Sequence, residues 1–428
     1  MTSKPEPRPR SIRHQVGILL MLLAPLLGVT GCSSVTKWNM MPAPTVHQYL
    51  GERVFDRMAT DERSPDMKIF YATNRPGTGP ADDRVYENGS IDRLNLGTAT
   101  VHFGDQSMTW QGLLTLSTLR KGKIETPLHL DNATQSATVP GSGSAGFSQA
   151  VNRTLATKDH KQLTIYVHGA QSSFFKSCVQ GAQFYHFMTR EGVLLSFSWP
   201  STGSFLAYKK DVEFADQSVE RFADLIEFLA ANTDAEKINI LAYSAGAQVA
   251  APGLALLRER HASLSDAALR RKLRIGVAYF AAPDVSLAKF TNTYLPAFYK
   301  LVDNTTVTFH RKDSVLKWAI MANKESRLGR PDGGELTEEE IAFLEKAAAR
   351  ERLDAIDMQY EPVKRPLDFK AHGHWYTNEW VSSDVIIQFL YHPRPDERGL
   401  KRKPDSEAWY IPVDYPDRLQ ELIEKAKA

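Results

Sequence analysis

The chain has 428 residues, 42% of them hydrophobic, which is enough for one large α/β core with additions or for two domains. Lys plus Arg (52) nearly balances Asp plus Glu (50), and the formal net charge is +2. With no overall field to attract nucleic acid, we expect no nucleic-acid partner, and a small molecule or a peptide is the better expectation for the substrate.

The first 31 residues have the build of a secretory signal. Basic residues precede an apolar run over 16–27, and small residues then lead to Cys32. The run is shorter than the roughly 18 apolar residues of a spanning helix, so a transmembrane segment is disfavoured. The sequence VTGC at 29–32 resembles the lipobox of bacterial lipoproteins, which implies that Cys32 carries lipid such as palmitate. Ser33 resembles a signal for sorting to the outer membrane, facing the periplasm; an uncleaved anchor helix or an ordinary signal is the alternative.

Composition divides the rest of the chain into three parts. Residues 32–66 are polar with scattered prolines and are predicted to form a flexible tether. The folded domain is expected over 67–392, and 393–428 is left as a tail that either packs on the core or stays free. Within the domain, the first strands are predicted over 67–73, 98–103 and 109–117, and a long loop over 131–159.

From residue 162 onward, short apolar runs alternate with longer segments of helical period. This alternation indicates an α/β fold with a mostly parallel sheet flanked by helices. The strands are predicted over 163–167, 193–197, 238–242, 275–281, 305–310 and 355–358. The clearest helices between them are 211–232, with one apolar stripe, and 337–350, which the capping box Thr337-Glu338-Glu339-Glu340 opens.

The strongest motif lies where the predicted strand 238–242 runs into Ser244 and then into a helix. Ser244 stands between small residues, with Ala242 two positions before it and Gly246 two after. A nucleophile elbow needs this pattern, because the serine sits on a strained turn where strand and helix approach closely. An ordinary serine cap at a helix N-terminus is the alternative.

A second turn supports the elbow. The strand 163–167 ends in His168-Gly169, followed by polar residues. In serine esterases a turn of this kind supplies one backbone N–H of the oxyanion hole, here that of Ala170, and the residue after the nucleophile, here Ala245, supplies the other. The alternative is an ordinary turn whose histidine forms hydrogen bonds inside the protein.

The general base is predicted to be a histidine late in the chain, because this fold orders its triad as Ser, acid, His. His372 and His374 both follow the last predicted strand, and His374 is preferred because His-x-Tyr resembles the lipase pattern. The two histidines could instead bind a metal with Asp384, but the sequence offers no third close ligand and no His-Glu-x-x-His helix. We therefore expect no metal and no cofactor.

Two aspartates compete for the acid of the triad. Asp284 follows the strand after the nucleophile, and Asp313 follows the next strand, where the fold usually places the acid. Asp313 is therefore favoured, with Asp284 either the acid itself or a helix cap. Asp211 is expected to cap the helix that it precedes, and Arg75 to brace the N-terminal strands. Cys178 is expected to be a buried, unreactive thiol, because no activating histidine is obvious near it.

With these residues placed, the chain resembles a bacterial family of α/β-hydrolase-like proteins of largely unassigned function in the esterase/lipase superfamily. The likeness runs from about Met67 to Leu390 and rests on motifs in order: FYATNR at 70–75, VHG at 167–169, FSWPS at 197–201 with Tyr208 and Asp211, the elbow, APD at 282–284, Ile356-Asp357 and GHWY at 373–376. Tyr243 and Ala245 depart from the family, where His and Met often flank the serine. The resemblance implies an α/β-hydrolase fold and serine hydrolase chemistry.

These observations predict a serine esterase or lipase-like enzyme, acting on a small-molecule or lipid ester through an acyl-enzyme at Ser244. Two alternatives stay open. A hydrolase fold without activity could serve as a binding or assembly lipoprotein of the envelope, since fold does not guarantee function. An acyltransferase would pass the acyl group to another alcohol instead of water. The sequence identifies no protein partner.

Overall fold

The structure is a computed structural model. It describes residues 37–120, 124–204, 207–332, 334, 336–350, 352–358, 371–404 and 406–427. The predicted signal segment 1–31 and the lipidation site Cys32 lie outside these residues. None of the described helices is both long and apolar enough to cross a membrane.

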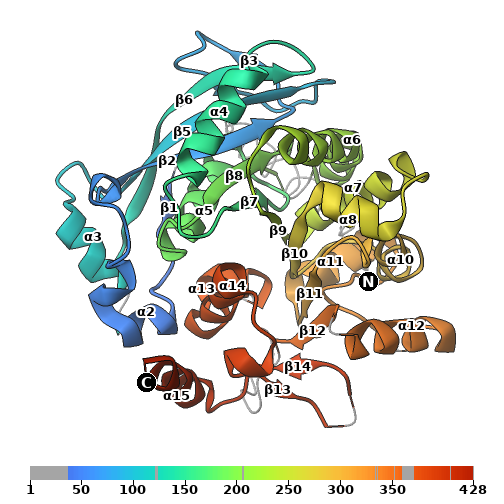
Figure 1. The fold of residues 1–428 in the computed structure, drawn as a ribbon. Coiled ribbons are helices and arrows are strands. Elements are labelled where there is room, and N and C mark those ends of the chain that lie inside the picture. Colours follow the sequence, from blue (N-terminus) through green and yellow to red (C-terminus); the bar gives the residue numbers. More distant parts are fainter. Residues whose placement is uncertain are drawn as a thin grey trace, which may run out of the picture. The chain divides into compact units, whose positions relative to one another are not determined.

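The described residues contain a 12-stranded, mostly parallel sheet (Figure 1). From edge to edge its strands are β1 (Trp38–Asn39), β6 (Pro127–Val139), β5 (Leu94–Phe103), β2 (Asp66–Thr73), β8 (Val193–Ser198), β7 (Gln162–Val167), β9 (Lys237–Tyr243), β10 (Ile275–Ala281), β11 (Asn304–Phe309), β12 (Leu353–Asp357), β14 (Trp409–Tyr410) and β13 (Lys401–Arg402). Every neighbouring pair from β2 to β14 is parallel, and the pairs at both ends are antiparallel. The predicted α/β-hydrolase type of sheet, with extra N-terminal strands, is confirmed.

Both faces of the central strands β7 to β10 are buried, because side chains of a strand alternate between its two faces and helices cover each of them. On β9, Ile238 and Ile240 enter one core and Leu241 enters the other. The first face is covered by α4 (Ser144–Leu155), α6 (Tyr208–Asn232), α7 (Ala247–Arg260), α8 (Asp266–Leu273), α10 (Leu295–Phe298) and α12 (Glu338–Ala349). The second is covered by α2 (Thr45–Leu50), α3 (Trp110–Ser117), α5 (Phe174–Phe187), α13 (His374–Thr377), α14 (Glu379–Tyr391) and α15 (Tyr415–Lys427). In Figure 1, α6, α7 and α8 lie together beside the central strands.

The register of the central strands brings the turns that follow β7, β9 and β10 together at the carboxyl ends of these strands. Val167 at the end of β7 pairs with Ala242 of β9, and Tyr243 pairs with Ala281 at the end of β10. The carboxyl ends of these parallel strands therefore meet, and the segments that follow them converge there. In open α/β sheets, ligands bind at the carboxyl ends of the strands.

The strands predicted from residue 162 onward and the two clearest helices are confirmed. Strands β7 to β12 all lie within two residues of their predicted bounds. Helix α6 spans Tyr208–Asn232, and the capping box of Thr337 and Glu340 opens α12. Long apolar periods and caps identify these elements without tertiary information.

The prediction of a tether over 32–66 is wrong for its described part, 37–66. Strand β1 pairs with β6, and α2 packs against α14 and α15. The Val46 amide donates a hydrogen bond to Ser383 Oγ at 3.1 Å, and Phe55 is buried. The apolar residues of this polar segment are too irregularly spaced to show a period, yet Val46 joins the second core and Phe55 packs against Leu114 of α3.

The boundary predicted at 392 is not a boundary of the fold either. Strand β14 extends the parallel sheet beside β12, and Arg398 forms a buried ion pair with Asp384, with Arg398 Nε 3.2 Å from Asp384 Oδ1. Leu419 of α15 is buried in the second core. Residues 393–427, as far as described, therefore complete the main domain.

Two further predictions are wrong. Residues 109–117 form not a strand but the helix α3, with Thr109 as its cap, since the Thr109 side chain accepts the Gly112 amide. Residues 131–159, predicted as a loop, hold most of β6 and the whole of α4. Strand β6 is polar and partly exposed, so its pairing with β5 rather than its composition determines its structure.

Candidate active site

Ser244 lies on a strained turn between β9 and α7, as predicted for a nucleophile elbow. The short 3₁₀ turn Ser244–Gly246 joins the two elements, and Ser244 has φ 53°, a value that non-glycine residues rarely adopt. A Cβ atom on Gly246 would lie 2.5 Å from the carbonyl oxygen of Val167. The turn therefore requires glycine at 246, because β7 and the start of α7 approach too closely for a side chain.

Two hydrogen bonds link Ser244, His372 and Asp313 into a chain. His372 Nε2 lies 2.7 Å from Ser244 Oγ, and His372 Nδ1 lies 2.8 Å from Asp313 Oδ2. All three side chains are buried or nearly so. A carboxylate on Nδ1 holds the proton there, which leaves Nε2 free to accept the serine proton.

The prediction of His374 as the partner of Ser244 is wrong, because His372 occupies that place. His372 lies in the 3₁₀ turn Ala371–Gly373, and the Tyr243 ring packs on it with centroids 5.4 Å apart. His374 begins α13 and packs instead against His310, with ring centroids 5.5 Å apart. The two histidines are two residues apart on a tight turn and point to different sides, which the sequence His-x-His does not show.

Asp313, the favoured acid, lies at the predicted place and also caps α11 (Ser314–Asn323). Its Oδ1 accepts the amides of Val315 at 2.9 Å and Leu316 at 3.0 Å, while Oδ2 faces His372. Burial alone would raise the pKa of Asp313, but the charge and hydrogen bond of His372 and the two amides lower it below its ordinary value. The carboxyl therefore stays ionised at neutral pH.

Asp284, the alternative acid, belongs to a different network. Tyr208 Oη donates to Asp284 Oδ2 at 2.7 Å, and Arg327 Nε lies 3.1 Å from Asp284 Oδ1. Burial raises the pKa of Asp284, and the charge of Arg327 opposes that shift. The backbone amide of Asp284 donates to the Ser244 carbonyl at 3.0 Å, so Asp284 supports the elbow turn from its main chain.

The His168-Gly169 turn packs directly against the elbow. A Cβ on Gly169 would lie 2.9 Å from Ser244 Cβ, and Ala170 lines the same cavity as Ser244. The His168 ring is stacked on Trp199 at 5.0 Å, and burial lowers the pKa of His168 to about 3, so the ring is neutral. The assignment of the Ala170 and Ala245 amides as oxyanion donors stays a prediction.

Two buried charged residues brace this turn, and sequence analysis missed the role of one of them. Arg75 donates to the carbonyls of Ser172 at 2.6 Å and Trp199 at 2.7 Å, which extends its predicted bracing role to the turn itself. Asp211 accepts the Gln171 amide at 3.1 Å. The prediction of Asp211 as a helix cap is wrong, because α6 begins three residues earlier, at Tyr208.

A cavity of about 410 Å³ opens beside Ser244, within the size range of small-molecule sites. Part of its wall is formed by α11, and the turn after β7 and the start of α6 contribute to the rest. The lining residues are Ala170, Gln171, Tyr208, Lys209, Ser244, Asp284, Val315, Trp318, Ala319, Met321 and Ala322.

The other titratable candidates lie away from this cavity. Asp384, considered above as a metal ligand with the histidines, is paired with Arg398. Cys178 is fully buried in α5, and burial raises the pKa of its thiol, in line with the expected unreactive cysteine.

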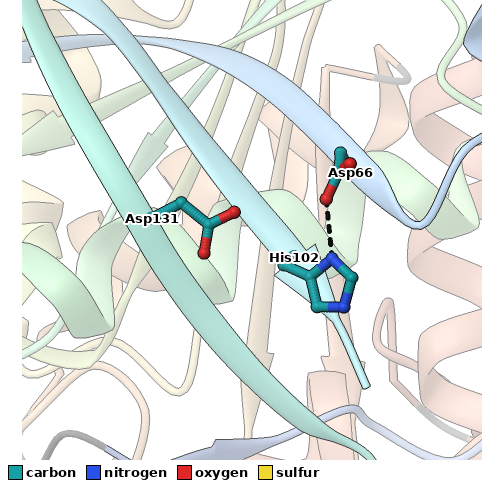
Figure 2. Close-up of side chains that lie close together, drawn as sticks. All are labelled: Asp66, His102 and Asp131. Carbon is teal, nitrogen blue, oxygen red and sulfur yellow. Dashed lines mark hydrogen bonds and ion pairs between the residues drawn. The ribbon is translucent and has the colours of Figure 1, made fainter. Parts of the chain in front are cut away.

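Figure 2 shows a cluster of metal-ligand residue types that sequence analysis missed: Asp66, His102 and Asp131, one from each of three adjacent strands. His102 Nδ1 lies 2.6 Å from Asp66 Oδ1, and His102 Nε2 donates to the Asp105 carbonyl at 2.8 Å. Because both ring nitrogens face oxygen, the arrangement suits a protonated, ion-paired imidazole. Only strand pairing brings these residues together, so spacing in the sequence gives no signal.

The His102 cluster predicts a pH-dependent contribution to stability. Burial lowers the pKa of His102, but the bond to the Asp105 carbonyl and the bond and charge of Asp66 raise it overall. A histidine whose pKa is higher in the folded than in the unfolded protein stabilises the fold. This stabilisation is fully present below the pKa of the unfolded state, about 6.5, and is lost as the pH rises through the pKa of the folded state. The difference in free energy of unfolding between wild type and His102→Gln, measured in urea, should shrink between pH 6 and pH 9. His129→Gln, at an exposed neighbouring histidine, is the control; a His102→Gln difference that grows with pH contradicts the ion pair.

Comparison with known proteins places the chain in a family. Residues 144–375, more than half of the chain, match the model of the family described as alpha/beta hydrolase of unknown function (DUF900). The match includes Ser244, Asp313 and His372 and begins after β6. The searches of curated proteins and of solved structures gave no match. The chain therefore belongs to the DUF900 family of alpha/beta hydrolases, as the resemblance of its motifs predicts.

Proposed function

We propose that the protein is a serine hydrolase that cleaves a carboxylic ester, with Ser244 as nucleophile, His372 as general base and Asp313 as the acid of the triad. The observation that carries the proposal is the hydrogen-bonded chain from Ser244 Oγ through His372 to Asp313, built on a serine of positive φ. A nucleophile, a base within 3 Å of it and a third group that orients the base are the parts that acyl transfer needs.

The mechanism follows from these contacts. His372 Nε2 removes the Ser244 proton as the oxygen attacks the ester carbonyl, and the Asp313 carboxylate stabilises the imidazolium that forms. The Ala170 and Ala245 amides are the proposed donors to the developing oxyanion. The imidazolium then protonates the leaving alcohol, and water activated by His372 releases the acyl group from Ser244.

A thioester or an amide is the second candidate bond after the ester, because the triad chemistry is the same for all three and the preference among leaving groups depends on the shape of the pocket. An acyltransferase would use the same residues and pass the acyl group to an added alcohol. Product that forms only when an acceptor alcohol is present would favour that alternative.

The location proposed for this activity is the bacterial envelope. We infer from the lipobox-like VTGC at 29–32 that the chain is cleaved before Cys32 and anchored by lipid there, in the outer membrane facing the periplasm. Such an anchor would keep the protein beside membrane lipids, which makes lipid esters available as substrates.

The triad predicts a graded loss of ester hydrolysis among matched variants. Ser244→Ala and His372→Ala should each lower kcat for p-nitrophenyl esters by at least about 10³-fold, and Asp313→Asn by up to about 10⁴-fold, because the base loses its orientation. His374→Ala is the matched control, since its side chain is hydrogen-bonded to neither Ser244 nor His372. Asp284→Asn tests the alternative acid and should cost less than Asp313→Asn, because the Asp284 side chain is bonded to Tyr208 and Arg327 rather than to His372. Circular dichroism confirms that each variant is folded. A loss with His374→Ala as large as that with His372→Ala would contradict the assignment.

The anchor has its own test. In bacteria grown with an alkyne analogue of palmitate, the full chain should incorporate the label, and Cys32→Ala should abolish incorporation, because Cys32 supplies the acceptor. Cys178→Ala, which removes the other cysteine of the chain, should keep the label. Labelling that persists in Cys32→Ala, or is absent from the wild type, would overturn the lipoprotein assignment.

A further inference from the structure

We infer that the acyl group of the substrate is apolar and extended, and that α11 is the surface that selects it. The inference rests on the proposed function, because it concerns the cavity beside Ser244. It identifies a substrate class and two specificity-determining residues, Trp318 and Met321.

The part of the cavity wall that α11 forms is apolar. Val315, Trp318, Ala319 and Ala322 lie at spacings of three, four and seven residues, which places them on one face of α11. Met321 lies three residues after Trp318 and also lines the cavity. The wall therefore offers a continuous apolar strip that begins beside the nucleophile.

Trp318 and Met321 are large apolar side chains that are exposed to solvent. Their exposed fractions are 56% and 61%, although Leu316 on the other side of the same helix is fully buried. Exposed apolar groups that adjoin a cavity favour contact with an apolar ligand, because that contact removes both surfaces from water. An acyl chain lying along α11 would cover them.

The hydroxyl group of Tyr208 and the carboxylate of Asp284, two polar groups of the cavity lining, are engaged with each other and with neighbouring side chains. Tyr208 Oη donates to Asp284, receives bonds from Asn323 at 3.2 Å and Gln248 at 3.3 Å, and Asp284 is paired with Arg327. Because Tyr208 and Arg327 already satisfy the Asp284 carboxylate, this network leaves a charged acyl group no buried partner among these three side chains. Lys209 is exposed, so its ammonium group stays hydrated. The surface left for the acyl group is thus the α11 strip.

Asp313 ties this strip to the reacting atoms. One carboxylate oxygen caps the first turn of α11 and the other holds His372 against Ser244. The Asp313 side chain therefore links the start of the strip to the Ser244–His372 hydrogen bond. An ester whose carbonyl carbon lies at Ser244 would extend its acyl chain from there along Val315 towards Trp318 and Met321.

The test compares kcat/KM for p-nitrophenyl acetate and p-nitrophenyl octanoate, using the full chain at one fixed concentration of a non-ionic detergent. Each fully buried methylene raises kcat/KM about fourfold, so partial burial of the added chain predicts at least about 30-fold preference for octanoate. Trp318→Gln and Met321→Gln should each lower kcat/KM for octanoate by about 10-fold and change that for acetate less than about twofold. Trp318→Phe should restore most of the preference.

The control is Tyr391→Gln, which removes an equally exposed large side chain, 67% exposed on α14 and outside the cavity lining. It should leave both substrates unchanged. Acetate hydrolysis without preference for octanoate, or equal losses on both esters in Trp318→Gln, would overturn this inference while leaving the proposed function intact. If the folded wild type cleaves neither ester, the proposed function falls, and this inference falls with it.

Discussion

The site depends on one constraint, the left-handed backbone of Ser244 where β9 meets α7. The turn is possible because glycines occupy the two closest contacts around it. Gly246 lies against the Val167 carbonyl, and Gly169 lies against Ser244 Cβ, so a side chain at either position would clash. A non-glycine residue at positive φ costs of the order of 1–3 kcal/mol and persists only when its surroundings enforce it. Here the parallel pairing of β7, β9 and β10 fixes the turn, and the Asp284 amide holds its carbonyl.

A second layer of buried charges keeps the segments around that turn in place. Arg75 and Asp211 hold the segment after β7 through the Ser172 carbonyl and the Gln171 amide, and Asp313 joins α11 to His372. Buried charges are costly unless they are paired or hydrogen-bonded, so each fixes the geometry of the groups that satisfy it. The rigid sheet thus places the serine, and charged side chains from loops and helix ends place its partners.

The central fold could be predicted because its signals are local. Apolar runs and caps identified the strands from β7 to β12 and two long helices, and small residues at 242 and 246 identified the elbow. The segment 37–66 and the strands β6, β13 and β14 could not be recognised, because polar sequences there become ordered by pairing with or packing against distant parts of the chain. The composition of a segment does not show which distant segment it will pair with.

Part of the active site could also be predicted, because two of its residues have local signals. Ser244 and Asp313 follow strands, and the order of elements places them at the sheet edge. The choice between His372 and His374 depends on which way a tight turn directs each ring, and that is decided by packing: Tyr243 lies on one ring and His310 on the other. Asp211 was misread because a residue near a helix start is usually a cap, whereas here the helix begins earlier and buries the carboxylate.

The most direct measurement of the central claim is covalent capture of Ser244 by a fluorophosphonate, followed by intact mass and peptide mapping of the adduct. The account predicts one adduct on Ser244 in the wild type and in His374→Ala. It predicts no adduct in Ser244→Ala and a rate slowed by at least about 10³-fold in His372→Ala, because the serine oxygen loses its base. A folded wild type that forms no adduct would contradict the hydrolase assignment and favour a hydrolase fold used only for binding.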